Sequence, residues 1–241
     1  MEEYIKQYHS FDKKLIYNFR LGDGGVGDNV KFFMMALESC IKTNTRLYYK
    51  RNGLEIEKYI KLKHDIMYID NADFEVVTPY MFYSSKDITF NIPINQVFSF
   101  SDEVIVNSHS LFPEVSDYIS IHLRLGDKYL ETDRNCVVCK EDVRSFSQKK
   151  IDDFIQENSN KNIFFCCDNN NYKLKLKEKY SNIIVTNCDI GHTSLVNTTK
   201  KQILDACTEF YILTNSQAIF AASSSGFSLI GSKFNDIPLI T

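Results

Sequence analysis

The residues that follow the apolar run 118–123 are suited to binding a phosphate. The run is rich in β-branched and apolar side chains, which indicates a buried strand. Arg124, Asp127 and Lys128 come directly after it, around Gly126. At the carboxyl end of a strand in an open α/β sheet, side chains point into the crevice where ligands bind. The planar guanidinium of Arg124 offers a fork of donors that fits a phosphate. The alternative is an ordinary strand end that carries a surface Arg–Asp pair.

A second candidate site is the glycine-rich segment near the N-terminus. Residues 22–27 match the spacing GxGxxG between a predicted strand and a predicted helix, which is the fingerprint of dinucleotide binding. That fingerprint is followed, about 20 residues on, by an acidic residue that binds the ribose. Here the second strand ends in the basic residues of Tyr49–Arg51, and Asp23 and Asp28 would repel a pyrophosphate. The loop fits better beside a hydroxyl group that must lose a proton.

The elements that position these segments alternate between strands and helices, which is typical of parallel, doubly wound sheets. In the first half, apolar residues spaced three and four apart predict a helix from Asp28 to about Cys40. Asp28 or Asn29 is expected to cap this helix. Strands are expected at Lys14–Phe19, Arg46–Tyr49, Ile66–Ile69, Glu75–Val77, Asp87–Phe90 and Glu103–Val106.

The second half shows a more regular alternation. The polar, turn-rich segment 107–113 is expected to separate an N-terminal domain, 1–110, from a C-terminal domain, 111–241. Strands are then expected at Tyr118–Leu123, Asn162–Cys167, Ile183–Thr186, Ala218–Ala222 and Ile237–Ile240. Helices are expected around Ile151–Ile155, at Tyr172–Tyr180, from Thr199 to about Thr214, and at Ser225–Lys233.

The composition is typical of a soluble globular protein. The chain has 241 residues, of which 44% are hydrophobic and 24% are charged. The formal net charge is −3 and no basic block is present, which argues against a nucleic-acid partner. No apolar stretch is long enough to span a bilayer, and the first residues lack the pattern of a signal peptide. We therefore expect a cytoplasmic protein.

Cysteine and aspartate pairs do not predict a metal site. The chain has seven cysteines, an odd number that does not indicate a disulfide framework. Cys136 and Cys139 have the spacing of a metal knuckle, but the other close pair, 166–167, is adjacent and lies in an apolar run. The acidic pair 152–153 lies at a predicted helix start, where it favours the helix dipole. No metal is therefore expected.

Taken together, these residues resemble a known family. The stretch His122–Lys128 reads H-L-R-L-G-D-K and is similar to the H-x-R-x-x-D-K motif of GDP-fucose-dependent fucosyltransferases of the α1,2-, α1,6- and protein O-linked groups. The similarity covers about residues 112–232 well and 14–42 modestly. It includes the glycine loop Gly24–Asn29, the strand end Phe164–Asn169 with the helix Lys175–Tyr180, the helix Glu209–Thr214 and the serine-rich turn Ser223–Ser228.

The resemblance implies an α/β chain with the GT-B fold, in which two Rossmann-like, doubly wound parallel-sheet domains face a cleft. It implies that Arg124 binds the β-phosphate of GDP and offsets charge as the bond to the sugar breaks. Asp127 would orient Arg124 or His122, and Lys128 would add a point charge. The backbone N–H groups that open the last helix would form a neutral anion site. The other donor-site residues implied are Gly25, Gly27, Asn29, Ser224, Ser225, Phe227 and Ser228.

The resemblance also implies how the base is recognised. Glu209 falls where the family carries an acid that reads guanine, and its carboxylate could accept from N1–H and the 2-amino group together. Asp205 lies one helical turn earlier and is the alternative reader. Asp168 and Asn169 leave a strand at its carboxyl end and could bond the ribose or the base. The family usually has Asp at the Glu209 position.

For inversion at the anomeric carbon, a base should face the acceptor hydroxyl. The resemblance places Asp28 there, with Asp23 as the fallback. Leu125 stands where some members carry a second arginine, which removes one possible phosphate contact.

We therefore expect a metal-independent, inverting glycosyltransferase without a cofactor, which uses GDP-fucose or a close GDP-deoxyhexose and a glycan acceptor. At 241 residues the chain is compact for this fold, so it is either a minimal version or a module of a longer polypeptide. Two alternatives stay open. One is an NAD(P)-binding Rossmann oxidoreductase, which rests on the segment 22–27. The other is a nucleotide-sugar or glycan-binding module that has lost its catalytic base.

Overall fold

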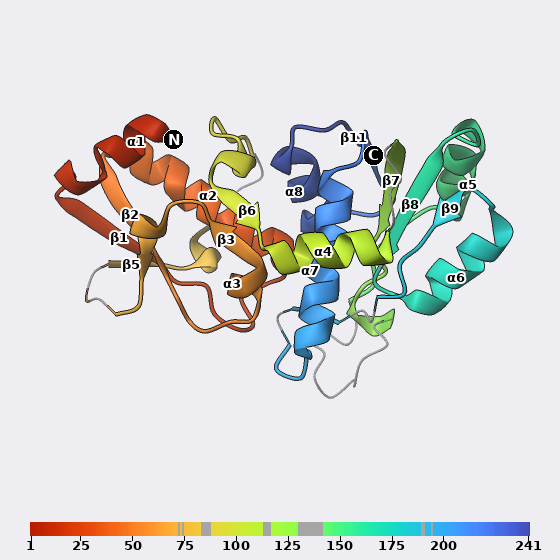
Figure 1. Cartoon of the computed structure of the whole chain (residues 1–241), viewed down its shortest axis with the longest axis horizontal. Coiled ribbons are helices and arrows are strands. Elements are labelled where there is room, and N and C mark those ends of the chain that lie inside the picture. The colour runs from red at the N-terminus through yellow and green to blue at the C-terminus, as the bar shows by residue number, and fades with distance from the viewer. Residues whose placement is uncertain are drawn as a thin grey trace.

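Two parallel sheets stand side by side in the computed structural model, with helices between and around them (Figure 1). The structure describes residues 1–71, 73, 75–82, 88–112, 117–129, 142–188, 191–193 and 195–241. The strand order is β4-β2-β1-β5 in the N-terminal sheet and β11-β10-β7-β8-β9 in the C-terminal sheet. All the strand pairs in both sheets are parallel. The predicted doubly wound α/β architecture is therefore confirmed.

The N-terminal sheet consists of β1 (Lys13–Tyr17), β2 (Thr45–Lys50), β4 (Tyr68–Ile69) and β5 (Glu75–Val77). A small antiparallel pair, β3 (Ile60–Leu62) and β6 (Phe98–Phe100), lies beside it. The helices of this half are α1 (Glu2–Lys6), α2 (Val26–Lys42), α3 (Ile56–Tyr59) and α4 (Asp102–Leu111).

The C-terminal sheet consists of β7 (Tyr118–Leu123), β8 (Asn162–Cys167), β9 (Ile183–Ile184), β10 (Ile219–Ala221) and β11 (Leu239–Ile240). Its helices are α5 (Gln148–Glu157), α6 (Asn170–Lys179), α7 (Lys200–Thr214) and α8 (Gly226–Phe234). Every residue of β7 is buried, because the strand is central and both faces of the sheet are covered. This explains why its sequence is rich in apolar and β-branched residues.

The register of the C-terminal sheet brings three chain segments to one edge. Leu123 lies opposite Cys167, and His122 lies opposite Ala221. The residues that follow these strands therefore meet at the carboxyl ends. Ser223 locks two of the segments together, because its Oγ accepts from the backbone N–H of Arg124 at 2.8 Å and donates to the Arg124 carbonyl at 2.9 Å.

The two halves share one hydrophobic core. The largest cluster of buried side chains joins α2 and the N-terminal strands to Phe210 of α7 and to Ile230 and Phe234 of α8. In Figure 1, α7 and α8 accordingly stand between the two sheets. A second cluster, which includes Ile121 and Phe165, fills the space around the C-terminal sheet. Because α8 packs against α2, the starts of these two helices are held in a fixed relation.

The prediction of a strand at 103–106 was wrong, because these residues form the first part of α4. Ser101 is the N-cap of this helix, and its side chain accepts from the backbone N–H of Val104 at 3.4 Å. Asp102 and Glu103 in the first turn also favour the helix dipole. The helix continues to Leu111, so the domain boundary predicted at 110/111 falls in its last turn. The division into two domains stays a prediction.

Some sequence predictions fall partly or wholly outside the described residues. These are the knuckle Cys136–Cys139, residue 87 of the strand predicted at 87–90 and residue 113 of the predicted boundary. Residues 88–90 are described and do not form a strand. Within the described part of the chain, no helix combines the length and apolar character needed to cross a membrane.

Candidate functional site

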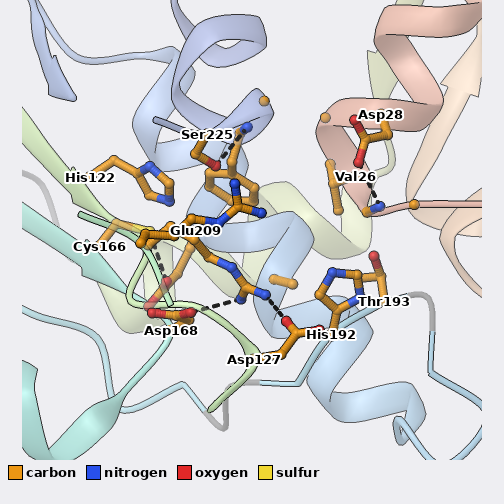
Figure 2. Close-up of a pocket in the computed structure, with 18 of the residues that line it drawn as sticks. Val26, Asp28, His122, Asp127, Cys166, Asp168, His192, Thr193, Glu209 and Ser225 are labelled. Atoms are coloured by element: carbon orange, nitrogen blue, oxygen red, sulfur yellow. Dashed lines mark hydrogen bonds and ion pairs between the residues drawn. The ribbon is translucent and has the colours of Figure 1, made fainter. Parts of the chain in front are cut away.

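A pocket of about 610 Å³ lies where the carboxyl ends of the C-terminal strands face the start of α2 (Figure 2). Its lining comes from the glycine loop, the turn after β7, the end of β8, residues 191–193, one face of α7 and the start of α8. Many of the residues predicted from the sequence meet here: Gly25, Gly27, Asp28, His122, Arg124, Asp127, Asp168, Glu209, Ser224, Ser225 and Phe227.

Arg124 is held between two carboxylates at the edge of the sheet. Its guanidinium forms an ion pair with Asp168 at 2.8 Å and another with Asp127. Asp168 also accepts from the backbone N–H groups of Leu125 at 2.8 Å and Gly126 at 3.1 Å. The carboxylate of Asp168 therefore holds the turn and the guanidinium in place, and its contact with the ribose or the base stays a prediction.

The segment that begins at Asp142 packs directly on this turn. Gly126 has φ +108°, and a Cβ there would lie 2.4 Å from the Asp142 carbonyl oxygen, so only glycine fits. The backbone N–H of Arg144 donates to the Leu125 carbonyl at 2.9 Å. Asp142 and Arg144 form an ion pair at 3.0 Å and both line the pocket. Sequence reasoning missed both residues, because they lie in a polar stretch with no motif.

His122 faces the pocket as a neutral, buried side chain. Its ring stacks on Phe227 with centroids 5.0 Å apart and an angle of 21° between the planes. Burial, with a smaller contribution from Arg124, lowers the pKa of His122 to about 3. Among the described residues, none bonds its buried Nδ1 atom.

The first turn of α2 places Asp28 on the opposite side of the pocket (Figure 2). The predicted capping by Asp28 or Asn29 was wrong, because Gly25 is the N-cap and Asp28 is the third helical residue. The Asp28 carboxylate accepts from the backbone N–H of Gly25 at 3.2 Å and pairs with Lys31 at 3.2 Å. The side chain of Asn29 points away to accept from the Tyr49 hydroxyl at 3.3 Å.

The starts of α2 and α8 touch beside the pocket. A Cβ on Gly27 would lie 2.7 Å from the carbonyl oxygen of Gly226, so the contact requires glycine. Ser225 is the N-cap of α8, and its Oγ accepts from the backbone N–H of Phe227 at 3.2 Å. The first N–H groups of a helix have no partner within it and attract anions. Two such helix starts therefore face one pocket.

We expect Gly27→Ala to push α2 and α8 apart, because the methyl group would collide with backbone rather than with a flexible side chain. Overpacking of this kind lowers the free energy of unfolding by about 1–3 kcal/mol. The matched control is Gly226→Ala at the first position of α8, whose Cβ would meet its nearest atom at 3.4 Å. Denaturant unfolding of both variants measures the difference, and equal stabilities would contradict the close contact.

Glu209 lines the pocket, but its carboxylate already has hydrogen-bond and ion-pair partners within the protein. It is buried, forms an ion pair with Lys173, accepts from the Thr186 hydroxyl and accepts from the Cys166 thiol at 3.0 Å. Asp205 pairs with Lys201 one turn away on the same helix and is not part of the pocket lining. Of the two predicted readers of the base, only Glu209 is therefore placed to contact a ligand in this pocket.

Four other predicted residues lie outside the pocket lining. Lys128 is exposed. Asn169 is the N-cap of α6, and its side-chain oxygen accepts a hydrogen bond from the backbone N–H of Tyr172 at 2.9 Å. Ser228 is buried in α8. Asp23, the fallback base, accepts from the backbone N–H of Arg20 at 2.8 Å. The roles predicted for these four side chains stay predictions.

His192 and Thr193 also line the pocket. His192 lies in a loop with no recognisable pattern, and the fold brings it next to the Gly25 loop. Figure 2 shows it on the same side of the pocket as Asp127. Burial, together with the positive charge of Arg124, lowers the pKa of His192. At neutral pH this imidazole is therefore uncharged and able to accept a proton.

Among the residues that the structure describes, no group of three or more His, Cys, Asp and Glu side chains is arranged to hold a metal ion. The five cysteines at positions 40, 166, 167, 188 and 207 are buried and free. Burial raises the pKa of the Cys166 thiol, and the nearby Glu209 raises it further. These cysteines are therefore protonated and unreactive at neutral pH.

Comparison with known proteins finds likeness in structure and not in sequence. No family model and no curated protein sequence matches the chain. The NodZ α-1,6-fucosyltransferase of Bradyrhizobium, co-crystallized with GDP, is 10% identical with a TM-score of 0.60, covering 91% of this chain and 92% of that chain. A variant of Arabidopsis thaliana FUT1 in complex with GDP is 10% identical with a TM-score of 0.56, covering 99% of this chain and 74% of that chain.

POFUT1 in complex with GDP-fucose is also 10% identical, with a TM-score of 0.54, covering 95% of this chain and 97% of that chain. At such low identity the likeness concerns the fold. It confirms the resemblance predicted from the motifs and the GT-B fold that the resemblance implied. The chain therefore has the mixed α/β fold with parallel sheets that these GT-B fucosyltransferases share.

Proposed function

We propose that this protein is a glycosyltransferase that moves fucose, or a close deoxyhexose, from a GDP-sugar to a hydroxyl group of a glycan. The observation that carries the proposal is the convergence of Arg124 with the starts of α2 and α8 on one pocket. In this fold the likeness to enzymes bound to GDP or GDP-fucose supports a diphosphate ligand there.

The start of α8 is important for binding the diphosphate, because Asp127 and Asp168 already balance the charge of Arg124. Backbone N–H groups at the start of α8 add attraction for an anion without adding charge. When the glycosidic bond breaks, negative charge develops on the β-phosphate. The fixed guanidinium and the dipole of α8 then stabilise this charge without having to rearrange. We therefore assign the leaving-group charge to these groups rather than to a metal ion.

The arrangement also suits an inverting displacement. Asp28 lies across the pocket from His122 and Asp168 (Figure 2), so a sugar held between them would present opposite faces to the two sides. An acceptor hydroxyl that enters beside α2 would transfer its proton to the Asp28 carboxylate while its oxygen attacks the anomeric carbon. The diphosphate would leave on the side of Arg124. This geometry supports the proposed inversion.

A thermal-shift screen tests the nucleotide part of this proposal. We expect GDP to raise the melting temperature more than UDP, ADP or NADP at equal concentration, because only ligands that bind the folded state stabilise it. At a hundredfold excess over Kd the stabilisation is about 2.7 kcal/mol, which corresponds to roughly 5–10 °C for a chain of this size. A larger shift with NADP would instead favour an oxidoreductase that uses the glycine loop.

A second measurement separates an enzyme from a binding module. Incubation with a panel of GDP-sugars and glycan acceptors should release GDP, and GDP-fucose should be the best donor. Stabilisation by GDP without any release of GDP would show a binding module that lacks a functional base.

A further inference from the structure

A buried ion pair lies behind the pocket, where α6 and α7 meet the C-terminal sheet. Lys173 of α6 and Glu209 of α7 are 1% and 3% exposed, respectively, and their side chains pair directly. Burial, the largest single influence, lowers the pKa of Lys173, but the charge of Glu209, its hydrogen bond to Lys173 and the nearby cysteines together outweigh burial, so the net direction is upward. The lysine therefore stays charged and keeps a charged partner in the core.

The two oxygen atoms of the Glu209 carboxylate have different neighbours. Oε1 accepts from Lys173 Nζ and from the Thr186 hydroxyl, and these two donors use both of its lone pairs. Oε2 accepts from the Cys166 thiol at 3.0 Å, which leaves one lone pair. Glu209 and Cys166 line the pocket, whereas Lys173 and Thr186 are not among its described lining residues. The atom available to a ligand is therefore Oε2.

We propose that Lys173 is a positioning residue for base selectivity, because it occupies Oε1 and leaves Glu209 to read the nucleotide base through Oε2 alone. The inference rests on the proposed function, since it concerns the base of the same diphosphate donor. It revises the expectation that the carboxylate accepts from two groups of guanine together. Lys173 itself does not touch the ligand.

Contact between the base and only one oxygen of the Glu209 carboxylate has a distinct chemical consequence. Guanine and hypoxanthine both carry an N1–H donor, and only guanine carries the 2-amino group. A carboxylate with one available oxygen bonds N1–H in either base and gains little from the amino group. Adenine presents an acceptor at N1, which would face the negative Oε2. The pocket should therefore treat GDP and IDP alike and bind ADP less well.

Titration calorimetry of the wild-type protein with GDP, IDP and ADP tests this. We expect GDP and IDP to bind within about threefold of each other, and ADP to bind about tenfold or more weakly, which is the usual effect of an unmatched buried polar group. A preference for GDP over IDP of about tenfold or more would overturn the proposal, because both oxygens would then read the base. Absence of binding by all three nucleotides would instead refute the proposed function.

A double variant tests whether the Lys173–Glu209 pair selects the base. Lys173→Met or Glu209→Gln alone leaves one buried charge without its partner, which destabilises a protein strongly. The double variant Lys173→Met/Glu209→Gln removes both charges and keeps the volume, so it should fold. We expect its discrimination against ADP to fall by about tenfold, since a glutamine amide both donates and accepts.

The matched control is Lys175→Met, the same substitution at an exposed position of α6. It should keep the wild-type order of the three nucleotides and the wild-type melting temperature. A double variant that melts normally and still discriminates fully against ADP would overturn the assignment, because the pair would then be structural only.

Discussion

Replacement of Arg124 by alanine is expected to abolish sugar transfer and to weaken GDP binding. The diphosphate would lose charge-assisted hydrogen bonds worth about 1.5–3 kcal/mol each, or roughly 10- to 150-fold in affinity per bond. The loss is aggravated because Asp127 and Asp168 would face the phosphates without the guanidinium that now balances them. Steady-state transfer assays and calorimetric titration with GDP measure the two effects.

Arg124→Lys separates charge from geometry. The lysine keeps a positive charge beside the two carboxylates, so the protein should still fold. Its ammonium group cannot reproduce the bidentate hydrogen bonds of a guanidinium with a phosphate. We expect it to restore stability and to recover little transfer. Near-normal turnover in either variant would contradict the phosphate site.

The second large effect is expected at Asp28. An asparagine there can still accept the N–H of Gly25, and the lost ion pair with Lys31 is partly exposed and contributes about 1 kcal/mol or less. Melting and GDP affinity should therefore change little in Asp28→Asn. Turnover should fall by about 10²–10⁴, the usual contribution of a general base. Rapid-quench or steady-state transfer assays with saturating GDP-sugar measure this fall.

A fully active Asp28→Asn variant would show that Asp28 only stabilises the start of α2. The proton would then pass to the departing phosphate or to His192, which lines the same pocket. A pH profile distinguishes these outcomes. The lowered pKa of His192 keeps its imidazole unprotonated at neutral pH, which is the form in which it could act as a base. Catalysis through His192 would therefore be lost only as the pH falls below the ordinary range of a histidine.

Local sequence patterns were sufficient for most of the fold. The strands at 118–123 and 162–167 lie where their apolar runs predict, because a central parallel strand is buried on both faces. Helix α7 starts where the sequence predicts, and a capping box of Thr199 with Gln202 marks that start. The segment 103–106 was misread as a strand, because a short apolar run does not distinguish a strand from a helix when its cap is overlooked.

Site residues could be predicted from the sequence where the reactive side chains lie close together in the chain, next to a recognisable strand or helix. His122, Arg124 and Asp127 follow one strand, and the glycine loop precedes one helix, so the sequence alone placed them at a cleft. Other pocket residues could not be found in this way. Arg144 and His192 lie in segments without periodicity, and only their packing against the turn after β7 and the Gly25 loop brings them to the pocket.

The sequence by itself determined the alternation of strands and helices and the charged turn that follows β7, because these depend on neighbours along the chain. The tertiary structure decided which polar atoms of these side chains are available to bind a ligand. Lys173 and Glu209 are separated by 36 positions, so no local pattern records their pairing. That pairing occupies Glu209 Oε1, while Asp168 is committed to Arg124 and its turn. The type of each side chain follows from the sequence. Which of its lone pairs can still bind a ligand depends on the neighbours that folding brings into contact with it.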